Sequence, residues 1–198
     1  MECKGNTLII EKSDILPCDM DAPQTMVEKI LIAGDFDFDI DRGPHFCSHP
    51  NLKEFEIVGD DIPFFVYCGA LYLKLNKETR LKDMSQAFNG EVGSALICCP
   101  PNNPNKNVVI HKDCSIVFGS AFYGCNLESL TFPSSIRRTA FAAFFNVKIK
   151  KMYIPNKIID IYPDFAEVND DVCFDNIEKG VPLDVEVLQY WKHNVTGQ

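Results

Sequence analysis

Long apolar runs are missing from this 198-residue sequence. None approaches the roughly 18–20 residues that a membrane-spanning helix requires, so we expect no membrane span. Excess positive charge is missing too, because 28 acidic residues outnumber 19 basic ones and the net charge is −9. An acidic chain does not attract phosphates, which argues against non-specific binding of nucleic acid.

Sequence signatures of catalysis are also absent. The chain contains no G-x-S-x-G nucleophile elbow, no phosphate-binding P-loop and no G-x-G-x-x-G dinucleotide fingerprint. We therefore predict a protein without enzymatic activity and without a cofactor. A metal-dependent enzyme is the alternative from a different functional class.

Metal-ligating residue types are present, but their spacing is wrong for a metal site. The segment GDFDFDIDRG (34–43) alternates aspartates like an EF-hand loop, yet Arg42 and Ser48 stand where that loop needs glycine and glutamate. The segments HFCSH (45–49) and HKDC (111–114) lack two ligand pairs at the spacing of a tetrahedral zinc site. We predict neither a calcium site nor a zinc site.

A secretory leader is not recognisable at the N-terminus, because acidic residues flank the short apolar run Leu8-Ile9-Ile10. The chain has nine cysteines, an odd number, including the adjacent Cys98 and Cys99. We expect reduced thiols that act as small buried hydrophobic residues, without structural disulfides. Together these features predict an intracellular protein.

What the sequence does contain is a repeat with a constant period. An apolar residue followed by His or Pro recurs at positions 110, 132 and 154, and Phe122 recurs at the same spacing as Phe144. Each unit ends in an apolar pattern with spacings of three and two. The copies are Leu127, Leu130 and Phe132; Ile149, Met152 and Ile154; Leu52, Phe55 and Ile57; Val27, Ile30 and Ile32; and a degenerate copy ending at Val172 and Phe174.

The end of each unit has the alternation of a short strand, with apolar residues inward and Thr131 or Tyr153 outward. Proline then ends the strand because it has no N–H for a ladder bond. One unit cannot bury its own apolar face, whereas stacked units form a continuous core. The repeat therefore predicts a solenoid in which Phe122 and Phe144 fill the space between strands.

The unit CSIVFGSAFYGCNLESLTFP, residues 114–133, resembles the repeat of the BspA-like leucine-rich repeat family. The segments YCGALYLK (67–74) and ALICCPPNN (95–103) resemble that family's hairpin island between repeats. The resemblance implies an α/β-class, strand-rich solenoid of short parallel strands stacked in a right-handed superhelix. It also implies a short hairpin, from which this sequence departs by the insertion of residues 76–93. Leu81, Met84 and Phe88 recur at helical spacing and predict a short amphipathic helix in that insertion.

This interpretation divides the chain into five regions. They are an N-terminal segment or cap (1–26), first leucine-rich repeats (27–58), a hairpin island (59–107) with an insertion at 76–93, further repeats (108–174), and a C-terminal capping helix (175–198). The helix has an alternative function, which is docking into the groove of a partner.

The resemblance implies protein binding through the outward positions of the stacked strands. The charge pattern supports a basic centre, because residues 46–159 carry thirteen bases and nine acids between two acidic ends. We predict an acidic partner surface, with tubulin or axonemal proteins as one option. The predicted binding residues are Val109, Ser129, Thr131, Arg137, Arg138, Lys148, Lys150, Lys151 and Tyr153.

Two cellular settings follow for such a scaffold. One is cytoplasmic, at the cytoskeleton or in a flagellum. The other is the cell surface, because the family is best known for surface adhesion. The lysines could also serve only to keep a solenoid soluble.

Overall fold

The computed structural model describes residues 2–11, 26–34, 46, 49–75, 93–140, 143–144, 146–153 and 160–161. Within these residues the regular elements are all β-strands. The predicted insertion, apart from Gly93, and the predicted C-terminal helix lie outside the described residues, as does the degenerate copy that ends at Phe174.

The first part of the chain forms a four-stranded sheet in the order β1-β2-β3-β4. These strands are β1 (Glu2–Lys4), β2 (Thr7–Ile10), β3 (Lys29–Ile32) and β4 (Glu54–Ile57). β1 and β2 make an antiparallel hairpin, whereas β2, β3 and β4 run parallel. The predicted N-terminal segment therefore contributes β2 as a parallel rung of its own.

The second part of the chain alternates between two sheets. A three-stranded parallel sheet has the order β12-β10-β8, with β8 (Asn107–Val109), β10 (Asn126–Thr131) and β12 (Lys148–Tyr153). A six-stranded sheet has the order β13-β11-β9-β7-β6-β5, with β5 (Phe64–Tyr67), β6 (Ala70–Leu75), β7 (Gly93–Cys98), β9 (Cys114–Val117), β11 (Arg138–Thr139) and β13 (Asp160–Ile161). Each turn of the coil thus passes from one sheet to the other.

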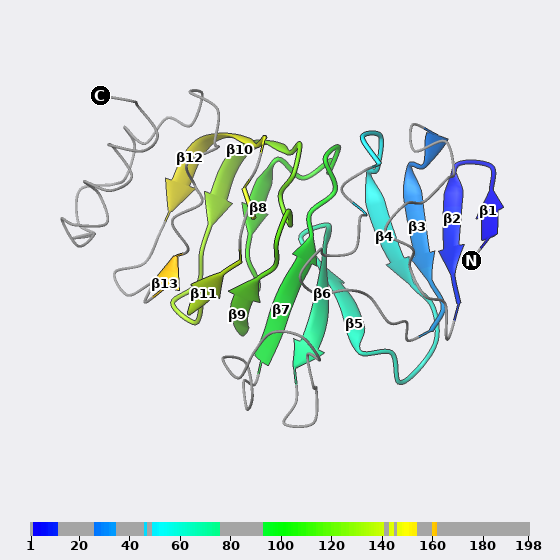
Figure 1. Ribbon diagram of the computed structural model, residues 1–198, viewed down its shortest axis with the longest axis horizontal. Coiled ribbons are helices and arrows are strands. Elements are labelled where there is room, and N and C mark those ends of the chain that lie inside the picture. Colours follow the sequence, from blue (N-terminus) through cyan, green and yellow to red (C-terminus); the bar gives the residue numbers. More distant parts are fainter. Residues whose placement is uncertain are drawn as a thin grey trace.

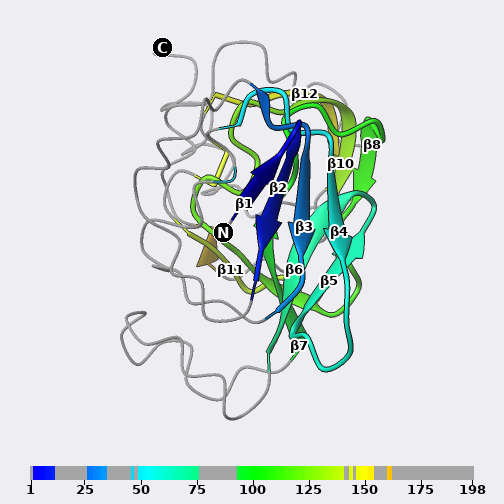
Figure 2. The same ribbon diagram turned by 90° about the vertical axis from the view of Figure 1, so that its right-hand side faces the viewer.

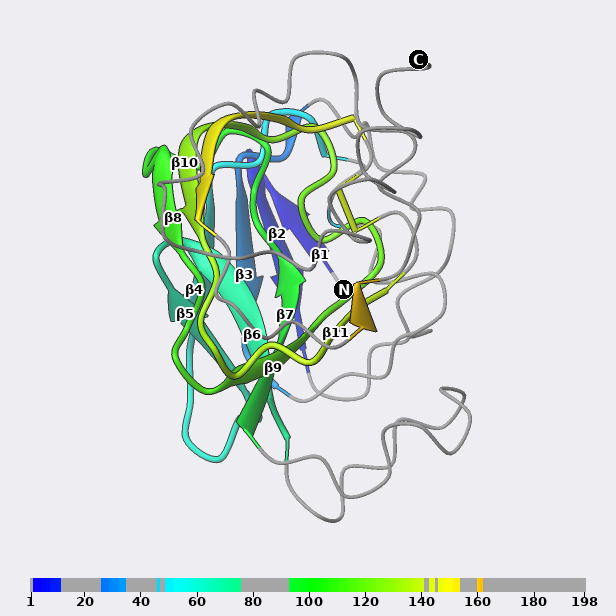
Figure 3. The same ribbon diagram turned by 90° about the vertical axis from the view of Figure 1, so that its left-hand side faces the viewer.

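The rungs of the solenoid succeed one another along the long axis of the molecule (Figure 1). Views along that axis show β8 and β10 on one side of the coil and β11 on another (Figures 2 and 3). The register follows the repeat, since Thr131 of β10 pairs with Val109 on one side and Tyr153 on the other. One period of the sequence repeat is therefore one turn of the solenoid, as the sequence predicts.

The apolar repeat positions form the core. Leu127, Leu130 and Phe132 are buried, as are Val27, Ile30 and Ile32. Phe55 is also buried, while Ile57 is half-buried. The rings of Phe122 and Phe144 stack with centroids 5.2 Å apart and planes 8° from parallel. These observations confirm the predicted inward positions, and the stacked rings fill the space between rungs as predicted for Phe122 and Phe144.

The predicted hairpin island is present as β5, β6 and β7, paired antiparallel in that order. Cys68 and Gly69 connect β5 to β6, and both have positive φ, as a two-residue type I′ hairpin requires. β7 then joins the solenoid by running parallel to β9. The island therefore continues the six-stranded sheet rather than standing apart from the repeats.

Candidate functional site

The outer face of β8, β10 and β12 brings together the predicted binding residues other than Arg137 and Arg138. Val109, Thr131 and Tyr153 are direct partners across the three strands, and Asn107, Ser129 and Lys151 form the adjacent row. The Ser129 hydroxyl donates a hydrogen bond to Asn107 Oδ1 at 2.9 Å, which links two rungs on this face. The two rows define what we call the outer strand face.

In the row of Val109, Thr131 and Tyr153, exposure is greatest at Val109. Val109 is 43% exposed, whereas Thr131 and Tyr153 are half-buried. Lys148, Lys150 and Lys151 are exposed. The face therefore offers an apolar and aromatic strip bordered by lysines, which suits a protein surface with acidic side chains.

The lysines on this face are not equivalent. The Lys150 ammonium lies 2.7 Å from Glu128 Oε1, and both side chains are more than half exposed. In contrast, Lys151 has no ion-pair partner among the residues that the structure describes. Lys151 is thus the better placed of the adjacent pair to meet an acidic partner.

Arg137 and Arg138 lie elsewhere on the coil. Arg138 belongs to β11 and pairs with Ile116 and Asp160, and the Arg137 N–H donates to Ser115 O at 2.9 Å. Both residues are part of the six-stranded sheet or directly precede its strand β11, on a different side from β10 (Figure 3). The structure does not bring them together with Tyr153, because residues 133–137 carry the chain around to the next sheet.

An aromatic cluster that the sequence did not predict adjoins the β8 end of this face. The His111 ring lies 5.0 Å from Tyr67 and 5.2 Å from Phe65, measured between ring centroids, and Phe65 stacks on Tyr72 at 5.1 Å. Tyr67 is 39% exposed. Aromatic residues such as those of Phe64–Tyr67 are typical of a strand, but no spacing in the sequence indicates contact with His111.

Tyr72 holds this cluster in place from the core. Its hydroxyl accepts a hydrogen bond from the His111 N–H at 3.2 Å, and burial raises the pKa of the phenol. Tyr72 is therefore a neutral anchor that fixes His111 beside the exposed Tyr67.

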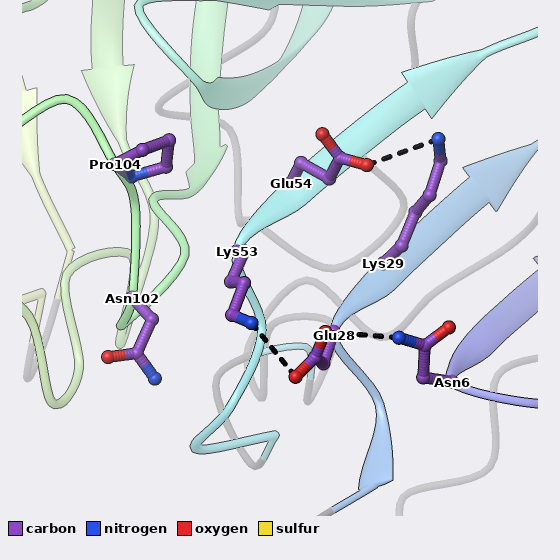
Figure 4. A pocket seen from close by; sticks show the side chains of 7 residues that line it. All are labelled: Asn6, Glu28, Lys29, Lys53, Glu54, Asn102 and Pro104. Carbon is purple, nitrogen blue, oxygen red and sulfur yellow. Dashed lines mark hydrogen bonds and ion pairs between the residues drawn. The ribbon is translucent and has the colours of Figure 1, made fainter.

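A polar hollow of about 350 Å³ lies at the beginning of β3 and β4 (Figure 4). It is lined by Asn6, Glu28, Lys29, Lys53, Glu54, Asn102 and Pro104. The Glu28 carboxylate lies 2.9 Å from the Lys53 ammonium and accepts a hydrogen bond from the Asn6 side-chain amide at 3.0 Å. The Lys29 ammonium lies 3.1 Å from the Glu54 carboxylate. No motif in the sequence marks these residues as a site, although Asn6 and Glu28 are one repeat period apart.

Potential metal ligands do not converge in the described part of the chain. The Cys114 thiol donates to Ile116 O at 3.1 Å, and burial raises its pKa to about 12. Cys99 receives a hydrogen bond from Asn103 at 3.5 Å. The aspartates of segment 35–41, together with His45 and Cys47, lie outside the described residues.

The cysteines that the structure describes are free thiols. Cys98, Cys99, Cys114 and Cys125 are buried, in keeping with a packing role, whereas Cys3 is exposed. The Cys125 thiol donates a hydrogen bond to Cys99 O at 3.3 Å. A side-chain hydrogen bond between Cys125 and Cys99 lowers the pKa of the Cys99 thiol.

The repeat region of the chain matches a known family of repeats. Residues 101–172 match the model of the BspA type leucine rich repeat region, in 6 copies. This segment carries BspA-type leucine-rich repeats. The matched segment contains β8 to β13, so the outer strand face is built from these repeats. No curated protein is significantly similar to the chain in sequence.

Three solved structures of bacterial proteins are similar in architecture. A leucine-rich repeat protein from Eubacterium ventriosum is 16% identical with a TM-score of 0.52, over 68% of this chain and 32% of its own length. A leucine rich cell surface protein from Faecalibacterium prausnitzii is 16% identical with a TM-score of 0.49, over 74% of this chain and 39% of its own. The pneumococcal vaccine antigen PcpA is 14% identical with a TM-score of 0.47, over 72% and 36%.

The chain thus spans about a third of the length of these proteins. At 16% identity, the similarity to the Eubacterium ventriosum protein shows the fold alone. Within its described residues, the chain has no helix with the length and apolar character needed to cross a bilayer.

Proposed function

We propose that the chain is a non-enzymatic protein-binding module that uses its outer strand face, together with Tyr67 and His111, to hold an acidic partner surface. The observation that carries this proposal is the alignment of Val109, Thr131 and Tyr153 on hydrogen-bonded neighbouring strands. Exposed apolar and aromatic side chains at the centre of a polar rim are typical of protein interfaces.

The electrostatic part of the proposal rests on Lys151, because Glu128 already pairs with Lys150. Charges at the rim of an interface mainly increase the association rate, and that effect weakens with salt. Binding through this face is therefore expected to weaken with ionic strength.

The first experiment compares capture of a native partner by the purified chain and by two variants. Tyr153→Ala and Lys151→Glu are expected to reduce capture at low salt, with the Lys151→Glu effect shrinking as salt rises. Lys4→Glu is the matched control, because Lys4 is similarly exposed but lies on β1 at the other end of the molecule. Equal capture by all four proteins would exclude the outer strand face as the binding site.

Cell-surface adhesion is the second candidate function. The match to BspA-type repeats favours it over a cytoskeletal role, because the family is best known for adhesion at cell surfaces. The match offers no support for binding to tubulin, which stays a prediction.

Experiments on cells distinguish display at the cell surface from a cytoskeletal location. Labelling of intact cells with a membrane-impermeant biotin reagent is expected to modify the protein if it is displayed at the surface. Co-sedimentation with purified microtubules, and no labelling of intact cells, would instead support the cytoskeletal setting.

A further inference from the structure

The polar hollow lies where the parallel ladder of the solenoid is interrupted. β4 is an edge of the four-stranded sheet and β8 is an edge of the three-stranded sheet. The segment before β8 closes this junction, because the Asn102 N–H donates to Leu52 O at 2.9 Å and its side-chain amide donates to Pro50 O at 2.5 Å. Asn102 and Pro104 thereby form one wall of the hollow, opposite the beginning of β3 and β4 (Figure 4).

The charges in the hollow compensate one another. It is lined by two lysines and two glutamates, each held by a partner of opposite sign. Lys53 pairs with Glu28, and Lys29 pairs with Glu54 and also with Glu56, which lies outside the lining. Lys53 lowers the pKa of Glu28, and Glu56 followed by Glu54 raises the pKa of Lys29, so these groups stay charged near neutral pH. A charged ligand would have to compete with one of these pairs, whereas a neutral ligand leaves them intact.

Hydrogen-bonding capacity remains after this pairing. The side-chain amides of Asn6 and Asn102 use their N–H groups, on Glu28 and on Pro50 O, which leaves both amide oxygens as acceptors. An ammonium group has three N–H donors, and Lys53 makes one such contact within the described residues. The walls of the hollow therefore carry acceptors at Asn6 and Asn102 and a donor at Lys53, with the apolar ring of Pro104 on the same wall as Asn102.

A hydroxyl group both donates and accepts, so adjacent hydroxyls on one ring match such a wall. The volume of about 350 Å³ falls at the small end of ligand pockets, which are about 300–1,000 Å³. We propose that this hollow binds a neutral polyhydroxylated ligand with the chemistry of a hexose unit. The site is separate from the outer strand face, so either can fail without the other.

The repeat supplies a matched control for this site. Glu128 and Lys150 form the same kind of ion pair on β10 and β12, at 2.7 Å, and neither residue lines the hollow. Lys53→Ala and Lys150→Ala therefore remove the same group from equivalent exposed pairs, and only the first removes it from the proposed site. Asn102→Ala removes the acceptor of the opposite wall while its backbone bond to Leu52 is kept.

The test is saturation-transfer NMR and calorimetric titration of the whole chain with glucose, galactose, mannose and N-acetylglucosamine and with disaccharides of these. Glucuronate and glucosamine serve as charged counterparts. We expect at least one neutral sugar to bind, its charged counterparts to bind more weakly, and Lys53→Ala and Asn102→Ala to weaken binding by about tenfold. Lys150→Ala is expected to leave the affinity unchanged, and melting curves establish that each variant is folded.

A glycopeptide carrying the same sugar distinguishes a free sugar ligand from a sugar attached to a protein. Binding of both forms indicates recognition of the hexose unit itself, and binding of the glycopeptide alone assigns the ligand to a glycoprotein. Absence of binding by every neutral sugar and by the glycopeptide would overturn the proposal. Equal loss of affinity in Lys53→Ala and Lys150→Ala, or tighter binding of the charged sugars, would overturn it as well.

Discussion

At the scale of single residues, the turn between β5 and β6 depends on a close approach that only glycine allows. Gly69 has φ +79°, and a Cβ added there would lie 2.5 Å from Asn103 Oδ1. Asn103 is buried, donates to Cys68 O at 3.0 Å and accepts from the Asn105 N–H at 2.9 Å. The hairpin and the segment before β8 are thus held together by one side chain.

We expect Gly69→Ala to destabilise the protein more than Gly5→Ala. Gly5 also has a positive φ, +63°, but a Cβ there would meet nothing within 4 Å. Both substitutions cost about 1–2 kcal/mol for the left-handed backbone, and Gly69→Ala costs at least about 1 kcal/mol more because Asn103 must move. Urea unfolding of the two variants measures the difference, and equal midpoints would contradict it.

The stacked pair Phe122 and Phe144 gives a second residue-scale prediction. Phe144 is 3% exposed and also contacts Phe132, with ring centroids 5.9 Å apart. Phe144→Ala is expected to lower the free energy of unfolding by about 3–5 kcal/mol, since it leaves a cavity between rungs. Met26→Ala, at a residue that is 58% exposed, should stay within about 0.5 kcal/mol of the native protein in the same melt.

At the scale of elements, β2 is a full rung of the ladder. Leu8 and Ile10 pair with Ile30 and Ile32 of β3, one repeat period later in the sequence, and all four are buried. The N-terminal hairpin therefore covers the apolar edge that β3 would otherwise expose.

Leu8→Ala tests this assignment. It is expected to cost about 2–5 kcal/mol of stability, the usual range for a buried leucine. Cys3→Ala on the exposed strand β1 is the control and should have little effect. A chain that tolerates Leu8→Ala as well as Cys3→Ala would show that the N-terminal hairpin is dispensable.

At the scale of the whole molecule, two apolar cores share a wall. Leu71 and Leu73 of β6 belong to the core that contains Leu8 and Phe55, whereas Ala70 and Tyr72 belong to the core that contains Phe122 and Phe144. β7 is likewise divided, with Ala95 in the first core and Leu96 in the second. The hairpin island therefore couples the two halves, which lie side by side along the long axis (Figure 1).

This coupling predicts one cooperative unfolding transition. Cys98 lies in the first core and Cys114 in the second, so alkylation of each thiol reports on its own half. Both are expected to resist iodoacetamide in the native protein and to become reactive at the same urea concentration. Cys3 is exposed and should react without urea, and mass spectrometry of the peptides resolves all three thiols. Separate midpoints for Cys98 and Cys114 would mean that the halves unfold independently.

The sequence by itself determined the period of the solenoid and the residues that face inward. A repeat unit can bury its apolar positions only against equivalent positions of its neighbours, so Leu130 and Phe144 were predictable from spacing alone. The same period would also have found β2, because Leu8 and Ile10 precede Ile30 and Ile32 by one repeat. The outward positions Val109, Thr131 and Tyr153 followed from strand alternation and register.

Only the tertiary structure decided where the outward residues meet. The turn of the coil separates Arg137 from Tyr153, although both lie in the same repeat, and joins Tyr67 to His111 across a longer stretch of chain. The hollow between Lys53 and Asn102 arises because the hairpin island interrupts the ladder there. Such contacts depend on the path of the chain between rungs, which leaves no periodic mark in the sequence because surface side chains are not constrained by packing.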